Sequence, residues 1–175
     1  MTASPAAAPS RAAADRFAAA CALYGPRLMA DLDLLEHHAA GILGNAGHES
    51  DGLRRLQEMR PVVPGSRGGW GWFQLTGPRR RAMEAWCRAA RLDPASDAAN
   101  YGYLLVELRG PEAAALAALR RAATLEAATE RFMRAFERPG VPHLARRVAW
   151  ARRALAALRP RTDPEPAGHA AHPEP

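Results

Sequence analysis

The sequence contains no lysine, so all 24 of its basic residues are arginine. It has only two cysteines and few aromatic residues (6%). No apolar run approaches the roughly 20 residues that a membrane-spanning helix needs. Cys21 and Cys87 lie far apart without the close spacing of metal ligands, so a cysteine-based metal site is not expected. We expect both to be small core residues, and an oxidising destination would leave a disulfide open.

The formal net charge of +6 comes with abundant alanine. A genome biased toward arginine and alanine codons would produce this composition. The same charge would also attract a polyanion such as nucleic acid, an acidic membrane surface or an anionic cell-wall polymer. No predicted helix gathers its arginines on one face behind a recognisable turn, so a nucleic-acid binder is the least favoured class. The alanine content favours a helical protein.

Two terminal segments differ in composition from the rest of the chain. Residues 1–10 contain too few bulky apolar groups to fold, and residues 159–175 are interrupted by prolines. His169 and His172 in the second segment have no companion ligands. We therefore expect disordered tails around one domain at residues 11–158. The first residues lack a basic segment followed by an apolar one, which predicts no secretory signal and synthesis in the cytoplasm.

Helical periodicity recurs throughout the predicted domain. The expected helices cover approximately residues 11–23, 35–49, 78–92, 101–109, 116–119, 125–138 and 144–158. Residues 50–77 break the pattern, because they are rich in glycine and proline and hold two of the four tryptophans. The prediction is a mainly α-helical single domain with a Gly/Trp-rich loop or small hairpin between helices.

The second predicted helix ends in an acidic residue on its apolar stripe. Leu35, Ala39, Ile42 and Ala46 are spaced as one helix face, and the next member of the series is Glu49. A carboxylate at such a position must be paired, have a raised pKa, or face a cleft. A carboxyl group that is protonated near neutral pH is what the general acid of a glycosidase requires.

Periodicity alone favours a simpler interpretation, in which Glu49 is the last helical residue and is either frayed toward water or paired with an arginine such as Arg54 or Arg55. Another strip of this helix repeats glycine at every third residue, at Gly41, Gly44 and Gly47. Each glycine costs about 1 kcal/mol of helix propensity relative to alanine. We expect these glycines to let a second helix approach closely, although an open surface for a bulky ligand is the alternative.

The segment GSRGGWGWFQLTGPRR at residues 65–80 surrounds Trp70 and Trp72 with glycines. Their rings could stack on sugar faces beside the amide of Gln74. The alternative is that the tryptophans plug the core, which we expect of at least one. The glycine spacing matches neither a P-loop nor a dinucleotide fingerprint. His48-Glu49 begins like a zinc-protease motif, but Gly52 stands where the second histidine should be, and we expect no metal or cofactor.

Four segments together resemble the phage tail lysozyme domain of the lysozyme-like superfamily, which includes goose-type lysozymes and soluble lytic transglycosylases. They are AAGILGNAGHESDGL, GGWGWFQLTGPRR, NYGYLLVEL at residues 100–108, and RFMRAFERPGVPHLARRVAWA at residues 131–151. The relatives share a helix ending in Glu-Ser and a later glycine-rich segment ending in glutamine. Here these features are Glu49-Ser50 and Gly71-Trp72-Phe73-Gln74. The last segment resembles a closing Phe-Glu-x-Pro-Gly motif, with Trp150 in place of a tyrosine.

The resemblance implies a lysozyme-like (α+β) fold and makes Glu49 the general acid of a peptidoglycan muramidase. Glu49 would protonate the glycosidic oxygen between N-acetylmuramic acid and N-acetylglucosamine, and Ser50 would orient it. The substrate-binding residues that it implies are Ser50, Trp70, Gly71, Trp72, Gln74, Asn100 and Tyr101. Trp70 and Trp72 stand where relatives carry small aliphatic residues.

A second carboxylate is not evident in the sequence. An inverting enzyme needs a base about 6.5–9.5 Å from the acid. Asp51 and Glu58 are the nearest candidates along the chain. Members of the family often use one glutamate, and transglycosylases let the muramic 6-hydroxyl attack in place of water. Hydrolysis and transglycosylation are both open.

Two other interpretations compete with the muramidase. Plant-class chitinases carry motifs similar to His48-Glu49-Ser50 and to residues 74–77, but separate them by a much longer interval that holds a second glutamate. A non-catalytic tail or baseplate module would keep the fold and bind glycan or neighbouring proteins. The expected partners are peptidoglycan glycan strands and phage tail or baseplate proteins, with no specific nucleic acid and no membrane insertion. We expect a phage or prophage-derived enzyme that acts on the cell wall when it is released or carried on a particle.

Overall fold

The computed structural model describes residues 11–61 and 63–159. In these ranges the chain forms seven α-helices and one π-helical turn, without a β-strand. The elements are α1 (Arg11–Leu32), α2 (Glu36–Glu49), α3 (Gly77–Ala90), α4 (Asp97–Arg109), α5 (Ala113–Arg120), α6 (Leu125–Phe132), η1 (Met133–Glu137) and α7 (Leu144–Leu158). The mainly α-helical prediction is confirmed.

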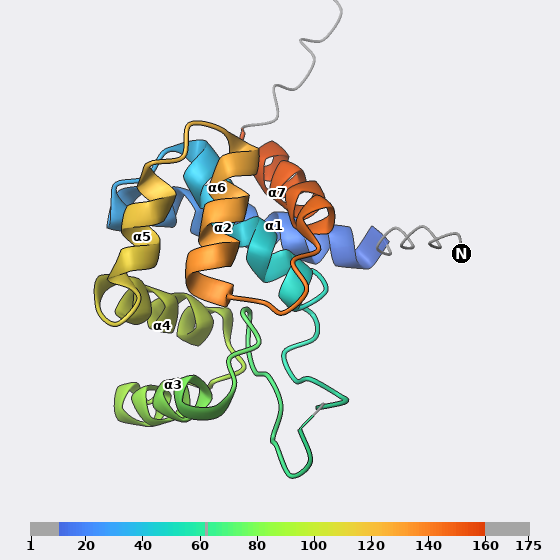
Figure 1. The fold of residues 1–175 in the computed structure, drawn as a ribbon, viewed down its shortest axis with the longest axis vertical. Coiled ribbons are helices and arrows are strands. Elements are labelled where there is room, and N and C mark those ends of the chain that lie inside the picture. Colours follow the sequence, from blue (N-terminus) through green and yellow to red (C-terminus); the bar gives the residue numbers. More distant parts are fainter. Residues whose placement is uncertain (1–10, 62, 160–175) are drawn as a thin grey trace, which may run out of the picture.

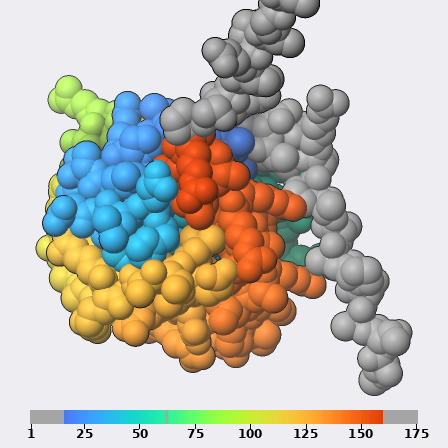
Figure 2. Space-filling model, turned by 90° about the horizontal axis from the view of Figure 1, so that it is seen from above, coloured from blue at the N-terminus to red at the C-terminus, as the bar shows by residue number. Residues whose placement is uncertain are grey.

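Helix α2 is the central helix of the fold. It runs between α1 and α6 and packs most extensively along α7 (Figure 1). Seen from above, α7 lies across the surface between the N-terminal helices and α6 (Figure 2). Every residue of α2 from His38 to Gly47 is buried. A helix that is covered on all sides in this way is a rigid support for the residues at its end.

The glycines of α2 allow its neighbours to approach closely. A Cβ atom on Gly44 would lie 2.5 Å from the backbone of Ala151 in α7. One on Gly41 would lie 3.0 Å from the backbone of α6, and one on Gly47 would lie 2.7 Å from the ring of Phe17. Real Cβ atoms do not come this close to backbone atoms, so the packing interpretation of the glycine strip is confirmed.

The start of α2 differs from the predicted apolar stripe. Leu35 is the N-cap residue rather than a member of the helix, and it is 61% exposed. Because its backbone is extended, its side chain leaves the face that the later residues share. His37 and His38 instead tie this end of α2 to the core, with Nε2 of each ring 2.9 Å from the carbonyl oxygen of Ala122.

The segment between α2 and α3 is a loop with two isolated antiparallel bridges, which join Trp70 to Gln57 and to Leu75. Trp72 plugs the core as expected, with a side chain that is 1% exposed. Its indole Nε1 donates to the carboxylate of Asp97 at 3.3 Å, and its backbone N–H donates to Oδ1 of Asn100 at 2.9 Å. The insertion is therefore pinned to α4.

Both cysteines are buried free thiols, which confirms that they are core residues. In the described part of the chain, no helix combines the length and the apolar character required to cross a membrane. The predicted tail at residues 1–10 and the segment 160–175, which makes up the second tail except for its first residue, lie outside the described residues. The predicted helix at residues 11–23 is longer than expected and continues to Leu32.

Candidate active site

Glu49 is the last residue of α2 and lies at the boundary between core and solvent. Its side chain is 21% exposed, although the helix before it is buried. Its Oε1 accepts a hydrogen bond from Nη2 of Arg147 in α7, and the two groups form an ion pair. The sequence therefore placed Glu49 correctly on the face that continues the buried stripe.

Arg147 is itself almost inaccessible, with 1% of its surface exposed. Its Nη1 donates to Oδ1 of Asn45 at 2.9 Å, and its Nε donates to the carbonyl oxygen of Pro142 at 2.9 Å. Asn45 stands one helical turn before Glu49, so both acceptors lie on the same face of α2. The guanidinium is thus held on three sides and presents a fixed positive charge to Glu49.

The predicted partners of Glu49 are engaged elsewhere. Arg54 and Arg55 both pair with Asp51, at 2.7 and 3.4 Å. The turn after α2 directs these arginines toward Asp51, whereas Arg147 comes from a helix 98 residues further along the chain. The ion pair was correctly anticipated as one interpretation, but its partner was wrong because the contact is non-local.

A second carboxyl group lies at this site. Glu137 ends the π-helical turn η1, and its Oε1 is buried without a hydrogen-bond partner, the one such side-chain atom in residues 11–61 and 63–159. Burial, and then the negative charge of Glu49, raise the pKa of Glu137 well above its ordinary value. Arg147 and Arg79 lower it by smaller amounts. The carboxyl group of Glu137 therefore keeps its proton to a higher pH than a solvated glutamate.

Aromatic packing brings the Gly-Trp-Phe-Gln segment to the turn that carries Glu137. The ring of Phe73 meets Phe136 edge-on, with centroids 5.2 Å apart, and Phe136 stacks on Phe132 at 4.7 Å. A π-helical turn inserts one residue into a helix and is often found at functional sites. The second motif thus reaches the site through Phe73 rather than through its tryptophans.

A buried ion pair lies on the other side of Phe136. Arg79 donates to both oxygens of Glu107 at 2.8 Å, and to the carbonyl oxygen of Phe136 at 3.1 Å. Its guanidinium also lies over the ring of Phe136, 4.3 Å from the centroid. Glu107 is only 2% exposed. Arg79 is therefore occupied by Glu107, although its charge still acts on Glu137.

Ser50 and Gln74 have structural contacts within the loop. The hydroxyl of Ser50 donates to the carbonyl oxygen of Ala46 at 2.7 Å and accepts from the backbone N–H of Leu53 at 3.1 Å. The amide of Gln74 donates to the carbonyl oxygens of Arg55, Leu56 and Gly71. These bonds shape the turn after α2 and close the loop. Contact of either residue with a glycan stays a prediction.

Asn100 and Tyr101 also join elements of the fold. The amide of Asn100 donates to the carbonyl oxygens of Pro94 and Ser96, and its Oδ1 accepts the hydrogen bond from the backbone N–H of Trp72. The phenol of Tyr101 donates to Asp31 of α1 at 2.5 Å. Burial, followed by the bond to Asp31, raises the pKa of Tyr101. Their predicted roles in glycan binding stay predictions.

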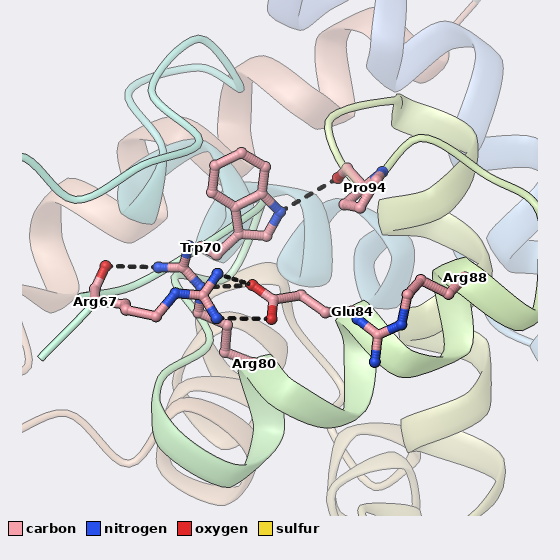
Figure 3. Close-up of a pocket in the computed structure, with 6 residues that line it drawn as sticks. All are labelled: Arg67, Trp70, Arg80, Glu84, Arg88 and Pro94. Atoms are coloured by element: carbon pink, nitrogen blue, oxygen red, sulfur yellow. Dashed lines mark hydrogen bonds and ion pairs between the residues drawn. The ribbon is translucent and has the colours of Figure 1, made fainter.

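Trp70 lines a pocket of about 570 Å³ that opens to solvent. The other lining residues are Arg67, Arg80, Glu84, Arg88 and Pro94. Figure 3 shows Arg67 and Arg80 converging on Glu84 beneath the indole, whose Nε1 donates to the carbonyl oxygen of Pro94 at 3.3 Å. Of the sequence-predicted aromatic residues, Trp70 is the one that lines this pocket, and stacking of a sugar there stays a prediction.

The two carboxylates proposed from the sequence are bound within their own loop. Asp51 pairs with Arg54, and Oε2 of Glu58 accepts from the backbone N–H of Gly69 at 2.7 Å. A role for either in catalysis stays a prediction. Sequence reasoning missed Glu137, although the residue belongs to the Phe-Glu-x-Pro-Gly motif that supported the resemblance. Its position in that motif was the signal that could have found it.

His48 precedes Glu49 and lies in the same charged environment. Burial, and then the positive charges of Arg147 and neighbouring groups, lower the pKa of His48 to about 4. Its ring lies 5.7 Å from that of His143, centroid to centroid. In the part of the chain that the structure describes, no group of three or more His, Cys, Asp or Glu side chains is arranged to hold a metal ion.

A sequence-family profile described as phage tail lysozyme matches residues 27–158. The matched region contains Glu49, Glu137 and Arg147, and it defines the class as a lysozyme-like protein built on a single helical domain. The chain belongs to the phage tail lysozyme family. A search of curated proteins and of solved structures found no match. Family membership indicates a lysozyme-like function that is directed at peptidoglycan.

Proposed function

We propose that this protein is a muramidase that cleaves the bond between N-acetylmuramic acid and N-acetylglucosamine, with Glu49 as the proton donor. The observation that carries the proposal is the position of Glu49. A partly exposed carboxyl group ends an otherwise buried helix and is oriented by Arg147. A general acid needs such a fixed position beside the scissile oxygen, together with access for the substrate.

The reaction follows from this arrangement. The Glu49 carboxyl group gives its proton to the glycosidic oxygen as the bond to the sugar C1 breaks. The positive charge that develops on the ring is stabilised by the Glu49 carboxylate that forms as the proton leaves. A water molecule or the muramic 6-hydroxyl then attacks C1 and loses its proton to the Glu49 carboxylate, which restores the acid.

The family supports a setting for this activity. We place the enzyme on the peptidoglycan of a bacterial cell wall, which it reaches on a phage-like particle or after release from the cell. Tail or baseplate proteins are the partners that such a setting requires. The excess of arginine would favour adsorption to an anionic wall polymer.

The test is digestion of purified peptidoglycan by the unmodified chain and by Glu49→Gln. Glutamine keeps the shape of the side chain but cannot act as the acid. We expect the rate to fall by about 10²–10⁴-fold, the range for loss of a general acid. Glu36→Gln is the matched control, because Glu36 lies on the same helix and is 47% exposed. Equal activity of Glu49→Gln and the unmodified chain would contradict the role of Glu49.

Mass spectrometry of the products distinguishes the two reactions. Reducing muramic ends indicate hydrolysis, and anhydro-muramic ends indicate transglycosylation. The ion pair with Arg147 also fits a second candidate, a glycan-binding module without catalysis, because an ion-paired carboxylate carries no proton to donate. A folded chain that binds several wall types and cleaves none of them would establish that candidate.

A further inference from the structure

A glycosidase acid must hold a proton, yet Glu49 is in an ion pair with Arg147. We propose that Glu137 is the second carboxyl group of the site and stores the proton that Glu49 delivers to the glycosidic oxygen. This inference rests on the proposed function and adds a residue to it. Glu137 acts through Glu49 and is therefore a positioning residue in the reaction.

The first observation is the unsatisfied oxygen of Glu137. A buried polar atom without a partner costs free energy, so native structures retain few of them. A charged carboxylate in such a place would be costlier than a neutral acid. Glu137 follows Phe136, whose ring packs against Phe132 and Phe73 and holds the turn in place. The geometry thus favours a neutral carboxylic acid with one oxygen free for a water molecule or a substrate hydroxyl.

The second observation is the number of charges around this group. Glu137 is influenced by Glu49 from α2, Arg147 from α7, Arg79 from α3 and Glu107 from α4. Arg79 is already paired with Glu107 through two hydrogen bonds. Arg138, the next residue, is paired through two hydrogen bonds of 2.8 Å with Glu112.

Only Arg147 is left as a counter-ion for Glu49 and Glu137 together in this part of the described structure. One guanidinium balances one carboxylate, so Arg147, Glu49 and Glu137 together are neutral when the two carboxyl groups hold a single proton between them. Two interacting carboxyl groups share protons in this way, and their titration belongs to the pair rather than to either residue. The proton resides on Glu137 because Arg147 binds Glu49 directly.

The proton balance of the step is complete with the groups present. Because Oε1 of Glu137 has no hydrogen-bond partner, its proton reaches the Glu49 carboxylate through a bridging water molecule, and Glu49 passes a proton to the glycosidic oxygen while the bond to C1 breaks. The attacking water or hydroxyl then forms the new bond to C1 and returns one proton to the pair. No oxidant, metal or co-reactant is needed, and the site ends in its starting state.

Glu137→Gln tests the proposal sharply, because glutamine matches a protonated glutamate in shape and in charge. We expect digestion of purified peptidoglycan to fall by about 100-fold or more at neutral pH, since the variant holds no transferable proton. Glu130→Gln is the control, because Glu130 forms an ion pair with Arg134 at the surface of α6. Full activity of Glu137→Gln would overturn the proposal.

The pH dependence of stability gives a second measurement that does not depend on activity. A carboxyl group with a raised pKa in the folded state contributes stability that is present below its ordinary value and is lost as pH rises through the folded-state value. We therefore expect the free energy of unfolding of the unmodified chain to fall relative to Glu137→Gln as the pH is raised from acid to neutral. An unchanged difference across this range would show that Glu137 is ionised like any surface glutamate.

A direct observation locates the proton. Carbon-13 NMR of the full chain with labelled glutamate carboxyl groups should show one carboxyl that stays protonated above the ordinary range. Its signal should disappear in Glu137→Gln. A signal that persists in Glu137→Gln and disappears in Glu49→Gln would place the proton on Glu49 and overturn the proposal. An inactive Glu49→Gln with an active Glu137→Gln would leave the proposed function standing and remove this inference alone. Absence of all lytic activity would remove the function, whereas the NMR result would still report where the proton is held.

Discussion

Within residues 11–61 and 63–159, two clusters contain a buried arginine that meets glutamate, and their ratios of carboxyl groups to cations are opposite. In the first cluster, Arg147 pairs with Glu49, and its charge also lowers the pKa of Glu137. In the second, Oε1 of Glu84 pairs with Nη2 of Arg67 at 2.5 Å and with Nε of Arg80 at 3.0 Å. The first cluster has more carboxyl groups than cations, so one of them is left to hold a proton. The second has more cations than carboxylates, so its glutamate, Glu84, is ionised and paired with both arginines.

The hydrogen bonds of the second cluster indicate a structural clasp. Nη1 of Arg80 donates to the carbonyl oxygens of Arg67 and Gly68, at 2.6 and 2.9 Å, and Nη2 donates to Oε1 of Gln57 at 3.1 Å. These bonds attach the loop after α2 to α3. The hydrogen bond from Arg67 lowers the pKa of Glu84, which stays ionised. Both arginines are buried, so the two clusters differ in their ratio of carboxyl groups to cations, and the proposed reactivity of the first depends on that ratio rather than on the burial of its arginine.

The largest effect is expected from Arg147→Met, which removes the cation from the first cluster. Two carboxyl groups would then share a site with no counter-ion in it. Loss of one partner of a buried ion pair costs about 3–5 kcal/mol of unfolding free energy. Denaturant unfolding measures this loss, and Arg146→Met, at an exposed neighbouring residue, should change stability by less than about 0.5 kcal/mol. Equal stabilities of the Arg147→Met and Arg146→Met variants would contradict the interpretation that Arg147 is the cation on which the first cluster depends.

Arg80→Met in the second cluster should be less damaging. Glu84 would keep Arg67 as its counter-ion, so no charge is left uncompensated, and the cost is limited to the lost bonds to the loop. Hydrogen bonds that involve a charged group contribute about 1.5–3 kcal/mol, and we expect a loss of about 2 kcal/mol. Denaturant unfolding under the same conditions gives the value. A loss as large as that of Arg147→Met would remove the distinction between the clusters.

The rigidity beneath the first cluster can be tested through Gly44→Ala. The new methyl group would collide with the backbone of Ala151, since it would lie only 2.5 Å away. Overpacking costs about 1–3 kcal/mol, and a clash with backbone atoms belongs to the upper part of that range, about 2–3 kcal/mol, which exceeds the gain in helix propensity of about 1 kcal/mol. Thermal unfolding should show a net loss of about 1–2 kcal/mol. Gly140→Ala is the control, because nothing lies within 4 Å of its added methyl group, and it should be neutral.

The smallest effect concerns His48, which precedes Glu49 in the chain and whose pKa is lowered in part by the charge of Arg147 in the first cluster. Its pKa is lowered to about 4 in the folded state, so the unfolded chain binds its proton more tightly. Stability from this residue is present above the ordinary pKa and is lost as pH falls from neutral toward 4. Allowing for solvent screening, the unmodified chain should lose about 1 kcal/mol more than His48→Asn between pH 7 and 5. Parallel stability curves for the two proteins would contradict this.

Local periodicity predicted most of the helices and the position of Glu49 at the end of α2, but it ended the first helix at residue 23, whereas α1 continues to Leu32. The spacing of apolar residues identified α2 and α7, because both bury a face along their length. The close approach at Gly44 could also be anticipated, because close packing against a second helix was the favoured explanation of so many glycines in a helix. Leu35 was misplaced, since a stripe carries no information about which residue is the N-cap.

The partners of Glu49 could not be predicted in this way. Arg147 lies 98 residues away, and no local pattern distinguishes it from the other arginines of the chain. Glu137 ends a π-helical turn, which departs from the 3.6-residue period that the sequence patterns assume. The resemblance to a family contained the motif around Glu137 but did not show which carboxyl group it brings to the site. Non-local pairing and irregular helix geometry account for both omissions.

The π-helical turn also makes the site sensitive to the length of the chain. Successive residues of an α-helix are rotated by about 100° around the axis, so one residue more or fewer changes the direction of everything that follows. Deleting the uncharged Ala135 would keep every charged residue of Met133–Glu137 but rotate the Glu137 side chain relative to the helix before it. Evolution or engineering can therefore silence the site by a change of register while every charged group is kept.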